Sequence, residues 1–298
     1  MHFLLDPLQF GFVRHALIVC AFAGALCGLL GVFVTLRGMS YIGHGLSHAI
    51  FGGAAICAAL NVNFFVGAGL WGLGSGLAIG RITQRRIIGS DAAIGVITTA
   101  SFAFGIALLG IYSRVKRSIE ATVFGSVLGV STSDVLVVVA VSVFTAVIVV
   151  LFYRQLLFTT FDPEVAEVSG VNVRRIDALL MLLLSFAILA SMKVLGVTLI
   201  AAALVVPAVV ARMLTNSFAR MLWLSSLIGG LCGLGGMYLS YHLDISSGAT
   251  IVLVGFLLFA LVFAATGGKG LKRVATMDDH GLAPGAAIPA AEPVRPHI

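Results

Sequence analysis

Long apolar stretches without charged side chains alternate with short polar connections along most of this chain. A membrane-spanning helix needs roughly 20 predominantly apolar residues, and most of these stretches approach that length. The run 38–80 contains no Asp, Glu, Lys or Arg and is too long for one span, so the polar Asn-Val-Asn turn at 61–63 divides it. The pattern predicts nine spans, at about 10–36, 45–60, 64–82, 92–112, 133–153, 176–192, 194–212, 220–241 and 245–266.

This pattern predicts an all-α fold, a polytopic helix bundle within a membrane, over residues 1–268. The composition agrees, since 60% of the residues are hydrophobic and 10% are charged, against about 25% charged in an ordinary soluble domain. The first span is expected to be a retained helix, because Asp6 and Pro7 precede it and neither a basic n-region nor a clear cleavage site is visible. Residues 269–298, rich in Ala, Pro and Gly, predict a disordered tail.

The placement of the basic residues predicts the orientation in the membrane. If the N-terminus lies outside, most of the 18 Lys and Arg residues and the C-terminal tail lie in the cytoplasm, as the positive-inside rule requires. The net charge of +6 therefore indicates membrane topology and not nucleic-acid binding. A short apolar piece, 118–128, is too short to span and is expected to be re-entrant or interfacial. The basic residues left outside are Arg14, Arg114, Lys116, Arg117 and Lys193.

Small residues recur at every fourth position on three of the predicted spans. Such stripes allow two helices to approach closely in lipid, and they indicate a tight bundle without pointing to a particular function. The stripes are Gly24 and Gly28, then Gly72, Gly76 and Gly80, then Gly229 and Gly233.

The longest polar connection, 161–175, lies between the fifth and sixth spans. Asp162 is a good N-cap, Pro163 suits the first helical position and Glu164 favours the positive end of a helix dipole. Gly170 is a plausible C-terminal stop. The segment predicts a helix of about two turns on the cytoplasmic face, and local physics supports a simple loop helix and a docking element equally.

Two histidines, His44 and His48, open the second span. Their i, i+4 spacing places them on one helix face, where two imidazoles can bind one divalent transition metal. A titratable pair is costly in lipid and needs a reason. Two ligands do not close a site, which suits a transporter because a fully coordinated ion would not leave. The alternative is that both rings are satisfied by hydrogen bonds between helices.

Pro207 interrupts the seventh span. Proline frees a backbone carbonyl, and such breaks often line a transport pathway. A harmless kink is equally well supported by the sequence, so Pro207 is a pathway candidate only.

Motifs for enzymatic chemistry are missing from the sequence. There is no G-x-x-x-x-G-K-[ST] phosphate loop, no H-E-x-x-H, no hydrolase elbow and no dinucleotide fingerprint. No acidic residue sits in the middle of a span, so no proton or sodium relay is evident. We expect a non-catalytic subunit without a permanently bound cofactor, which takes its energy from a partner.

Several ordered motifs resemble the permease subunits of bacterial zinc and manganese ABC importers, over about residues 5–266. They are LLGVFVTLRGMSYIGHGLSHAIFGGAA, SDAAIGVI, FGSVLGVSTSD, LFYRQLLFTTFDPEVAEVSGV, VLGVTLIAAALVVPAVVARML and LSYHLDISSGATIVL.

This resemblance implies a type II ABC importer-like bundle in the bacterial inner membrane. It implies two identical or related permease copies around one pathway, a cytoplasmic ATPase dimer and an extracytoplasmic metal-binding protein. It also implies that about 162–170 is the helix that receives the ATPase motion. The ATPase-coupling residues would be Phe161, Asp162, Pro163, Glu164, Ala166 and Gly170.

The family usually carries an Asp and a His four residues apart, in the metal path, where this chain has two histidines. His48 matches the family's His, and His44 stands where the Asp is expected. The exchange removes an oxygen ligand and a negative charge. Manganese prefers oxygen-rich sites whereas zinc accepts all-nitrogen ones, so we expect Zn²⁺ ahead of Mn²⁺ as cargo. A permease for a siderophore or cobalamin, and a membrane scaffold without transport, are the alternatives.

Overall fold

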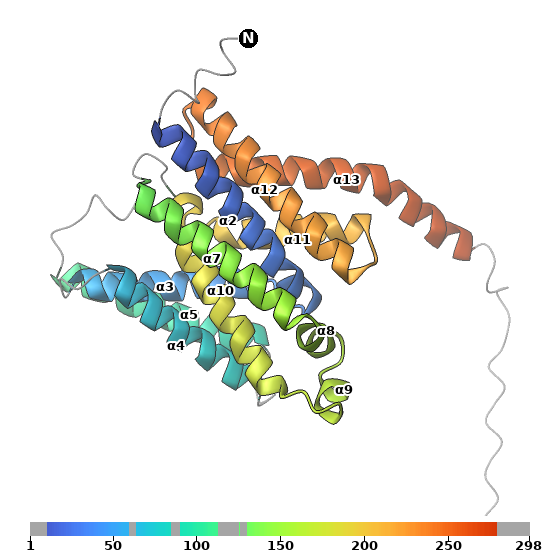
Figure 1. Ribbon diagram of the computed structural model, residues 1–298, viewed down its shortest axis with the longest axis horizontal. Coiled ribbons are helices and arrows are strands. Elements are labelled where there is room, and N and C mark those ends of the chain that lie inside the picture. The colour runs from blue at the N-terminus through green and yellow to red at the C-terminus, as the bar shows by residue number, and fades with distance from the viewer. Residues whose placement is uncertain (1–10, 60–63, 85–89, 113–124, 126–129, 279–298) are drawn as a thin grey trace, which may run out of the picture.

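The computed structural model describes residues 11–59, 64–84, 90–112, 125 and 130–278, and every described element is a helix. Figure 1 shows α3, α4 and α5 gathered on one side, α2, α11, α12 and α13 on the other, and α7 and α10 between them. The helices are α2 (Gly11–Leu36), α3 (Ile42–Ala59), α4 (Phe64–Gln84), α5 (Ser90–Tyr112), α7 (Thr132–Leu151), α8 (Tyr153–Phe161), α9 (Pro163–Val168), α10 (Val173–Leu195), α11 (Ile200–Leu214), α12 (Phe218–Leu243) and α13 (Ser247–Asp278).

Each predicted span corresponds to one of these helices. Within the described residues, five helices are long and apolar enough to cross a membrane: α2, α7, α10, α12 and the Ser247–Thr266 part of α13. The parts Ile42–Cys57 and Ala92–Leu108 and the helix α11 are shorter apolar helices. The predicted fold class, an all-α polytopic membrane bundle, is therefore confirmed.

The end of the last helix differs from the sequence-based boundary. The tail was expected from residue 269, but α13 continues to Asp278 and extends past the other helices in Figure 1. The Lys, Leu, Arg, Ala and Met residues after 268 are good helix formers, which outweighs the glycines among them. Residues 279–298 lie outside the described residues, as does the predicted interfacial piece 118–128 except for Gly125.

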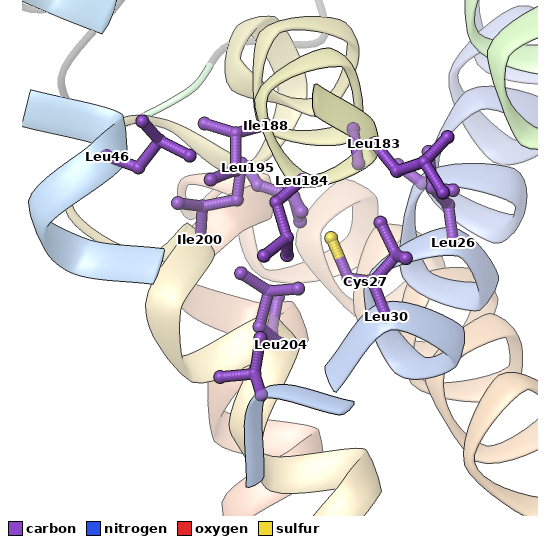
Figure 2. Close-up of a cluster of buried hydrophobic side chains, with 14 of the residues drawn as sticks. Leu26, Cys27, Leu30, Leu46, Leu183, Leu184, Ile188, Leu195, Ile200 and Leu204 are labelled. Carbon is purple, nitrogen blue, oxygen red and sulfur yellow. The ribbon is translucent and has the colours of Figure 1, made fainter. Parts of the chain in front are cut away.

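The core is organised around α10, which packs on α2, α3, α4, α7, α11 and α13. Aliphatic side chains from four helices meet there and exclude solvent almost completely. Interiors of this kind are close-packed. The packing of these side chains therefore fixes the start of α3 relative to α2 and α10. Figure 2 shows Leu26, Cys27 and Leu30 of α2, Leu46 of α3, Leu183, Leu184, Ile188 and Leu195 of α10, and Ile200 and Leu204 of α11.

Two of the predicted glycine stripes meet each other. The helices α2 and α12 run antiparallel and side by side (Figure 1), with Gly24 against Gly229. A Cβ atom at either position would fall on the carbonyl group of the other. One helical turn away along the same contact between α2 and α12, the Ser225 hydroxyl donates a hydrogen bond of 2.6 Å to the carbonyl of Gly28. The predicted close approach of helices is confirmed here.

Both ends of α10 are tied by ion pairs to other helices. Near its start, Asp177 lies 2.6 Å from the guanidinium of Arg37, which follows the last residue of α2. Near its end, the ammonium of Lys193 lies 2.7 Å from Asp134 in the first turn of α7. These pairs fix the helix that forms the centre of the bundle at both ends.

Candidate functional site

A tight turn delivers the chain from α2 into the helix that carries the two histidines. Gly38 takes the left-handed backbone conformation that favours glycine, with φ of 68°. Its amide donates to the carbonyl of Thr35 (3.3 Å), and the next amide, of Met39, donates to the carbonyl of Val34 (3.0 Å). This is a Schellman motif, and it leaves only a short connection before α3 and His44.

The histidines His44 and His48 lie together on one face of α3, as their spacing predicts. Their ring centroids are 4.3 Å apart and the rings are inclined by 78°. Two nitrogen ligands on one tetrahedral zinc ion are roughly 3.3 Å apart, given Zn–N bonds of about 2.0–2.1 Å. The two rings are thus close enough to share one ion. Both side chains are half-buried, so the described part of the chain leaves this face partly open.

One ring nitrogen of the pair has no hydrogen-bond partner among the described residues. Nδ1 of His48 is buried and makes no hydrogen bond to any described residue, and the ring packs on Phe102 of α5 at a centroid distance of 4.8 Å. A buried polar atom without a partner costs about 1–3 kcal/mol. Within the described residues no hydrogen bond between helices satisfies this nitrogen, and metal binding by His48 stays a prediction.

Ser47, between the two histidines, anchors their helix to the turn joining α10 and α11. Its buried hydroxyl lies 2.8 Å from the carbonyl oxygen of Val197 and 2.8 Å from that of His44. One hydroxyl proton serves both acceptors. The first turn of α3 is therefore held against a buried turn more than a hundred residues away in sequence.

The pair offers two metal ligands and no complete site. Among the described residues there is no group of three or more His, Cys, Asp or Glu side chains that could hold a metal ion. Further ligands for an ion at His44 and His48 would come from water, from a second copy of the chain or from residues outside the described ones. An open coordination sphere of this kind suits an ion that must leave again.

Pro207 lies elsewhere in the bundle. It is buried inside α11, which continues unbroken from Ile200 to Leu214. A small cavity beside it is lined by residues of α2, α11, α12 and α13, and its described lining includes none from α3. The structure does not bring Pro207 together with the histidines, and a pathway role for it stays a prediction.

The short helix predicted in the connection 161–175 is present as α9, and its caps are confirmed. The carboxylate of Asp162 accepts a hydrogen bond of 2.9 Å from the amide of Val165, and Pro163 occupies the first turn. Gly170, with φ of 83°, ends the helix in a Schellman motif, in which its amide donates to the carbonyl of Glu167 at 3.0 Å. Sequence alone was sufficient here because caps are local interactions.

The side chains in and beside α9 fall into two groups. Ala166, one of the predicted coupling residues, is fully buried, which fixes the inner face of the helix. Val168, which is 91% exposed, and Val165 lie on the outer face, and the predicted Phe161 at the end of α8 is also exposed. Figure 1 shows α8 and α9 beyond the ends of α7 and α10, at one end of the bundle. Exposed apolar side chains on a short, well-capped helix are typical of a contact surface.

The sequence indicated no functional role for Arg37. It entered only the count of basic residues that predicts the orientation in the membrane. The structure places Arg37 beside a cavity of about 480 Å³ that also borders Pro163, Glu164 and Glu167 of α9. A sequence signal existed, since Asp177 stands inside a predicted span and a carboxylate there needs a partner. Nothing local identified Arg37 as that partner, because 140 residues separate the two.

Comparisons with known proteins agree with this architecture. A family model described as "ABC 3 transport family" matches residues 9–266. The chain is 36% identical to the manganese transport system membrane protein MntC of Listeria innocua, over 91% of this chain and 96% of that protein. It is 39% identical to the protein of the same name from Halalkalibacterium halodurans, over 88% and 90%.

The likeness extends to a solved structure. PsaBC from Streptococcus pneumoniae in complex with Fab contains a chain that superposes with a TM-score of 0.79 at 34% identity. The match covers 87% of this chain and 94% of that one.

Proposed function

Because the chain belongs to the ABC 3 transport family, we propose that it carries a divalent transition metal across the membrane and that His44 and His48 bind the ion in transit. Its relatives are metal-ion ABC permeases, and it is a multi-pass membrane protein of that kind. A scaffold without transport, and a permease for a siderophore or cobalamin, are both less consistent with these relatives.

The observation that carries this proposal is the histidine pair itself. Two half-buried imidazoles, 4.3 Å apart, stand on one face of an apolar helix. One of them, His48, keeps a buried nitrogen that no residue in the described part of the chain bonds. Imidazole nitrogen is the ligand that zinc and other late divalent metals accept. Two adjacent imidazoles, one with a nitrogen that no described residue satisfies, are therefore suited to a passing cation.

The proposed partners supply further metal ligands for the histidine pair and a source of energy for transport. In a homodimer, two copies of the pair would present four imidazoles to one pathway. A cytoplasmic ATPase dimer, docked on α9, would supply the energy, since the sequence has no phosphate loop. A metal-binding protein would deliver the ion from outside the inner membrane. The N-terminus is then outside and the C-terminus cytoplasmic, as the positive-inside count favours.

Zinc is the proposed cargo, because His44 contributes a nitrogen where the family usually has a carboxylate. Zinc accepts a site made of nitrogen ligands, whereas manganese favours oxygen. Manganese is the second candidate, because relatives at 36–39% identity are named manganese transport proteins.

Uptake by the reconstituted complex separates the two cargoes, whereas affinity does not, because a given site generally binds Zn²⁺ more tightly than Mn²⁺. We expect the unchanged complex to take up ⁶⁵Zn at least about tenfold faster than ⁵⁴Mn, because its histidine pair offers only nitrogen ligands. The variant His44→Asp restores a carboxylate and should shift this ratio toward Mn²⁺. The loss of both histidines should abolish the binding of either metal. Faster uptake of ⁵⁴Mn by the unchanged complex would make manganese the cargo, and equal metal content with and without the histidines would reject the site.

A second prediction concerns the docking of the ATPase on α9. Val168→Asp should reduce co-purification of the ATPase subunit at least about tenfold, because charges are depleted from interface cores and desolvating one is costly. The folded amount of the permease should not change, since Val168 is 91% exposed and packs on little of its own chain. Val168→Thr keeps the side-chain shape and is the matched control, which should retain most of the ATPase. Full retention by the Asp variant would place the docking surface elsewhere.

A further inference from the structure

Arg37 holds three helices together at the end of the bundle where α9 lies. One terminal nitrogen, Nη1, donates to Oδ1 of Asp177 on α10 at 2.6 Å. The other, Nη2, donates to the hydroxyl oxygen of Thr159 on α8 at 2.9 Å, and Nε donates to that of Thr160 at 3.2 Å. The side chain of Arg37 is only 10% exposed. The planar guanidinium, with its donors in a rigid fork, thus joins α2 to both neighbours of α9.

The two threonine hydroxyls are oriented to receive these bonds. Thr160 donates its own proton to the carbonyl of Leu156 at 2.6 Å, and Thr159 donates to the carbonyl of Gln155 at 2.9 Å. With both protons turned back onto α8, the remaining lone pairs of the hydroxyls accept from Arg37. The arrangement is directional, so a displacement of α8 against α2 would stretch or bend these bonds.

The space between Arg37 and α9 is open. A cavity of about 480 Å³ is lined both by Arg37, Asp177 and the two threonines and by Pro163, Glu164 and Glu167 of α9. Within the described structure α9 packs mainly on α8 and α10. A push on α9 therefore does not press on α2 directly. It reaches α2 through α8 and α10, and both of these are bound by Arg37.

Beyond Arg37, the chain passes at once to the histidines. Arg37 is the residue after α2 (Gly11–Leu36), and the hydrogen-bonded turn at Gly38 and Met39 leads into α3, whose first turns hold His44. A movement of Arg37 is thus passed to the helix that would bind the cargo without an intervening flexible loop.

We propose that Arg37 is a positioning residue for energy coupling: it transmits a displacement of α9 to the start of α3 and so to His44 and His48. This inference depends on the proposed function, since it requires an ATPase on α9 and a metal ion at the histidines. It assigns to Arg37 the mechanical connection between α9 and the histidines.

A second, apolar contact also joins α8 to the bundle. Phe218 of α12 packs on Phe161 of α8 at a ring-centroid distance of 5.8 Å and on Phe33 of α2 at 5.7 Å. Aromatic contacts of this kind tolerate sliding better than charged hydrogen bonds, because packing contacts are individually weak and not directional. The aromatic contact accounts for cohesion, whereas the guanidinium accounts for directed transmission.

The test is the coupling ratio of the complete transporter, measured as metal ions moved per ATP hydrolysed in proteoliposomes with ⁶⁵Zn or ⁵⁴Mn. Arg37→Gln should leave the ATPase bound and hydrolysing ATP, but should lower this ratio at least about tenfold, within the range usual for coupling between sites. Asp177→Asn should act in the same direction. Lys193→Gln is the matched control, because it breaks an ion pair of similar length at the opposite end of α10, and it should keep the ratio.

The outcomes separate this inference from the proposed function. If the unchanged complex moves no metal, the proposed function itself fails. If it moves metal and Arg37→Gln has the same ratio, or Lys193→Gln lowers the ratio as much, Arg37 is merely structural. Should Arg37→Gln not fold, the double variant Thr159→Val with Thr160→Val keeps both charges and removes only the two hydroxyls, and with them the acceptors of Arg37. It should lower the ratio about threefold, as expected for the loss of modest hydrogen bonds, and an unchanged ratio there overturns the inference.

Discussion

Changing both His44 and His48 to alanine is expected to reduce metal uptake at least about 100-fold, since losing even outer-shell partners of metal ligands typically costs 10–100-fold in affinity. The two rings stand together on α3, and the described chain contains no group of three or more His, Cys, Asp or Glu side chains that could hold the ion in their place. Uptake of ⁶⁵Zn or ⁵⁴Mn by cells and by proteoliposomes measures the effect. Assembly with the ATPase should persist, because both rings are half-buried and lie on α3 and not on α9.

The control for this double variant is another histidine in an apolar helix. His242 of α12 packs against Tyr238 at a centroid distance of 4.7 Å, so His242→Ala removes a comparable aromatic contact. It should leave uptake close to that of the unchanged protein. Normal uptake by a well-assembled variant without His44 and His48 would show that the ion takes another route. Uptake lost equally in the His242 variant would show that the effect is structural.

Gly229→Val is expected to destabilise the permease by about 3 kcal/mol or more and so to lower the yield of folded protein. The added Cβ would meet the carbonyl of Gly24 on α2, and the two helices could accommodate it only by moving apart along their whole contact. Overpacking typically lowers the free energy of unfolding by about 1–3 kcal/mol and sometimes more. For a collision with backbone we expect a loss of about 3 kcal/mol or above. A folded protein is stable by only about 5–15 kcal/mol. Thermal unfolding in detergent and the yield of monodisperse protein measure the loss.

A glycine on the same helix offers a matched control for this prediction. Gly235 is exposed, and a Cβ built there meets nothing within 4 Å. Gly235→Val introduces the same side chain and raises intrinsic helix propensity, so its stability should equal or slightly exceed that of the unchanged protein. Equal losses in the two variants would mean that valine harms α12 wherever it is placed, and that the contact with α2 is not the cause.

The sequence alone identified those features that depend on near neighbours in the chain. Apolar runs long enough to span a membrane predicted the helices, because each helix satisfies its own backbone hydrogen bonds in lipid. The caps of α9 at Asp162 and Gly170 were predicted for the same reason, since a cap acts within one turn. The spacing of His44 and His48 sufficed to place both rings on one helix face. The resemblance in ordered motifs led to the family that the family model then confirmed.

Only the tertiary structure decided which distant elements meet. The Gly24 and Gly229 stripes were each visible in the sequence, but their contact with each other was not. No local sequence pattern predicts the hydrogen bond from Ser47 to the turn at Val197. None predicts the bonds that Arg37 makes to α8 and α10 either. The physical reason is that such contacts form between residues more than a hundred positions apart, and their partners are selected by the packing of the whole bundle and not by the preferences of any single helix.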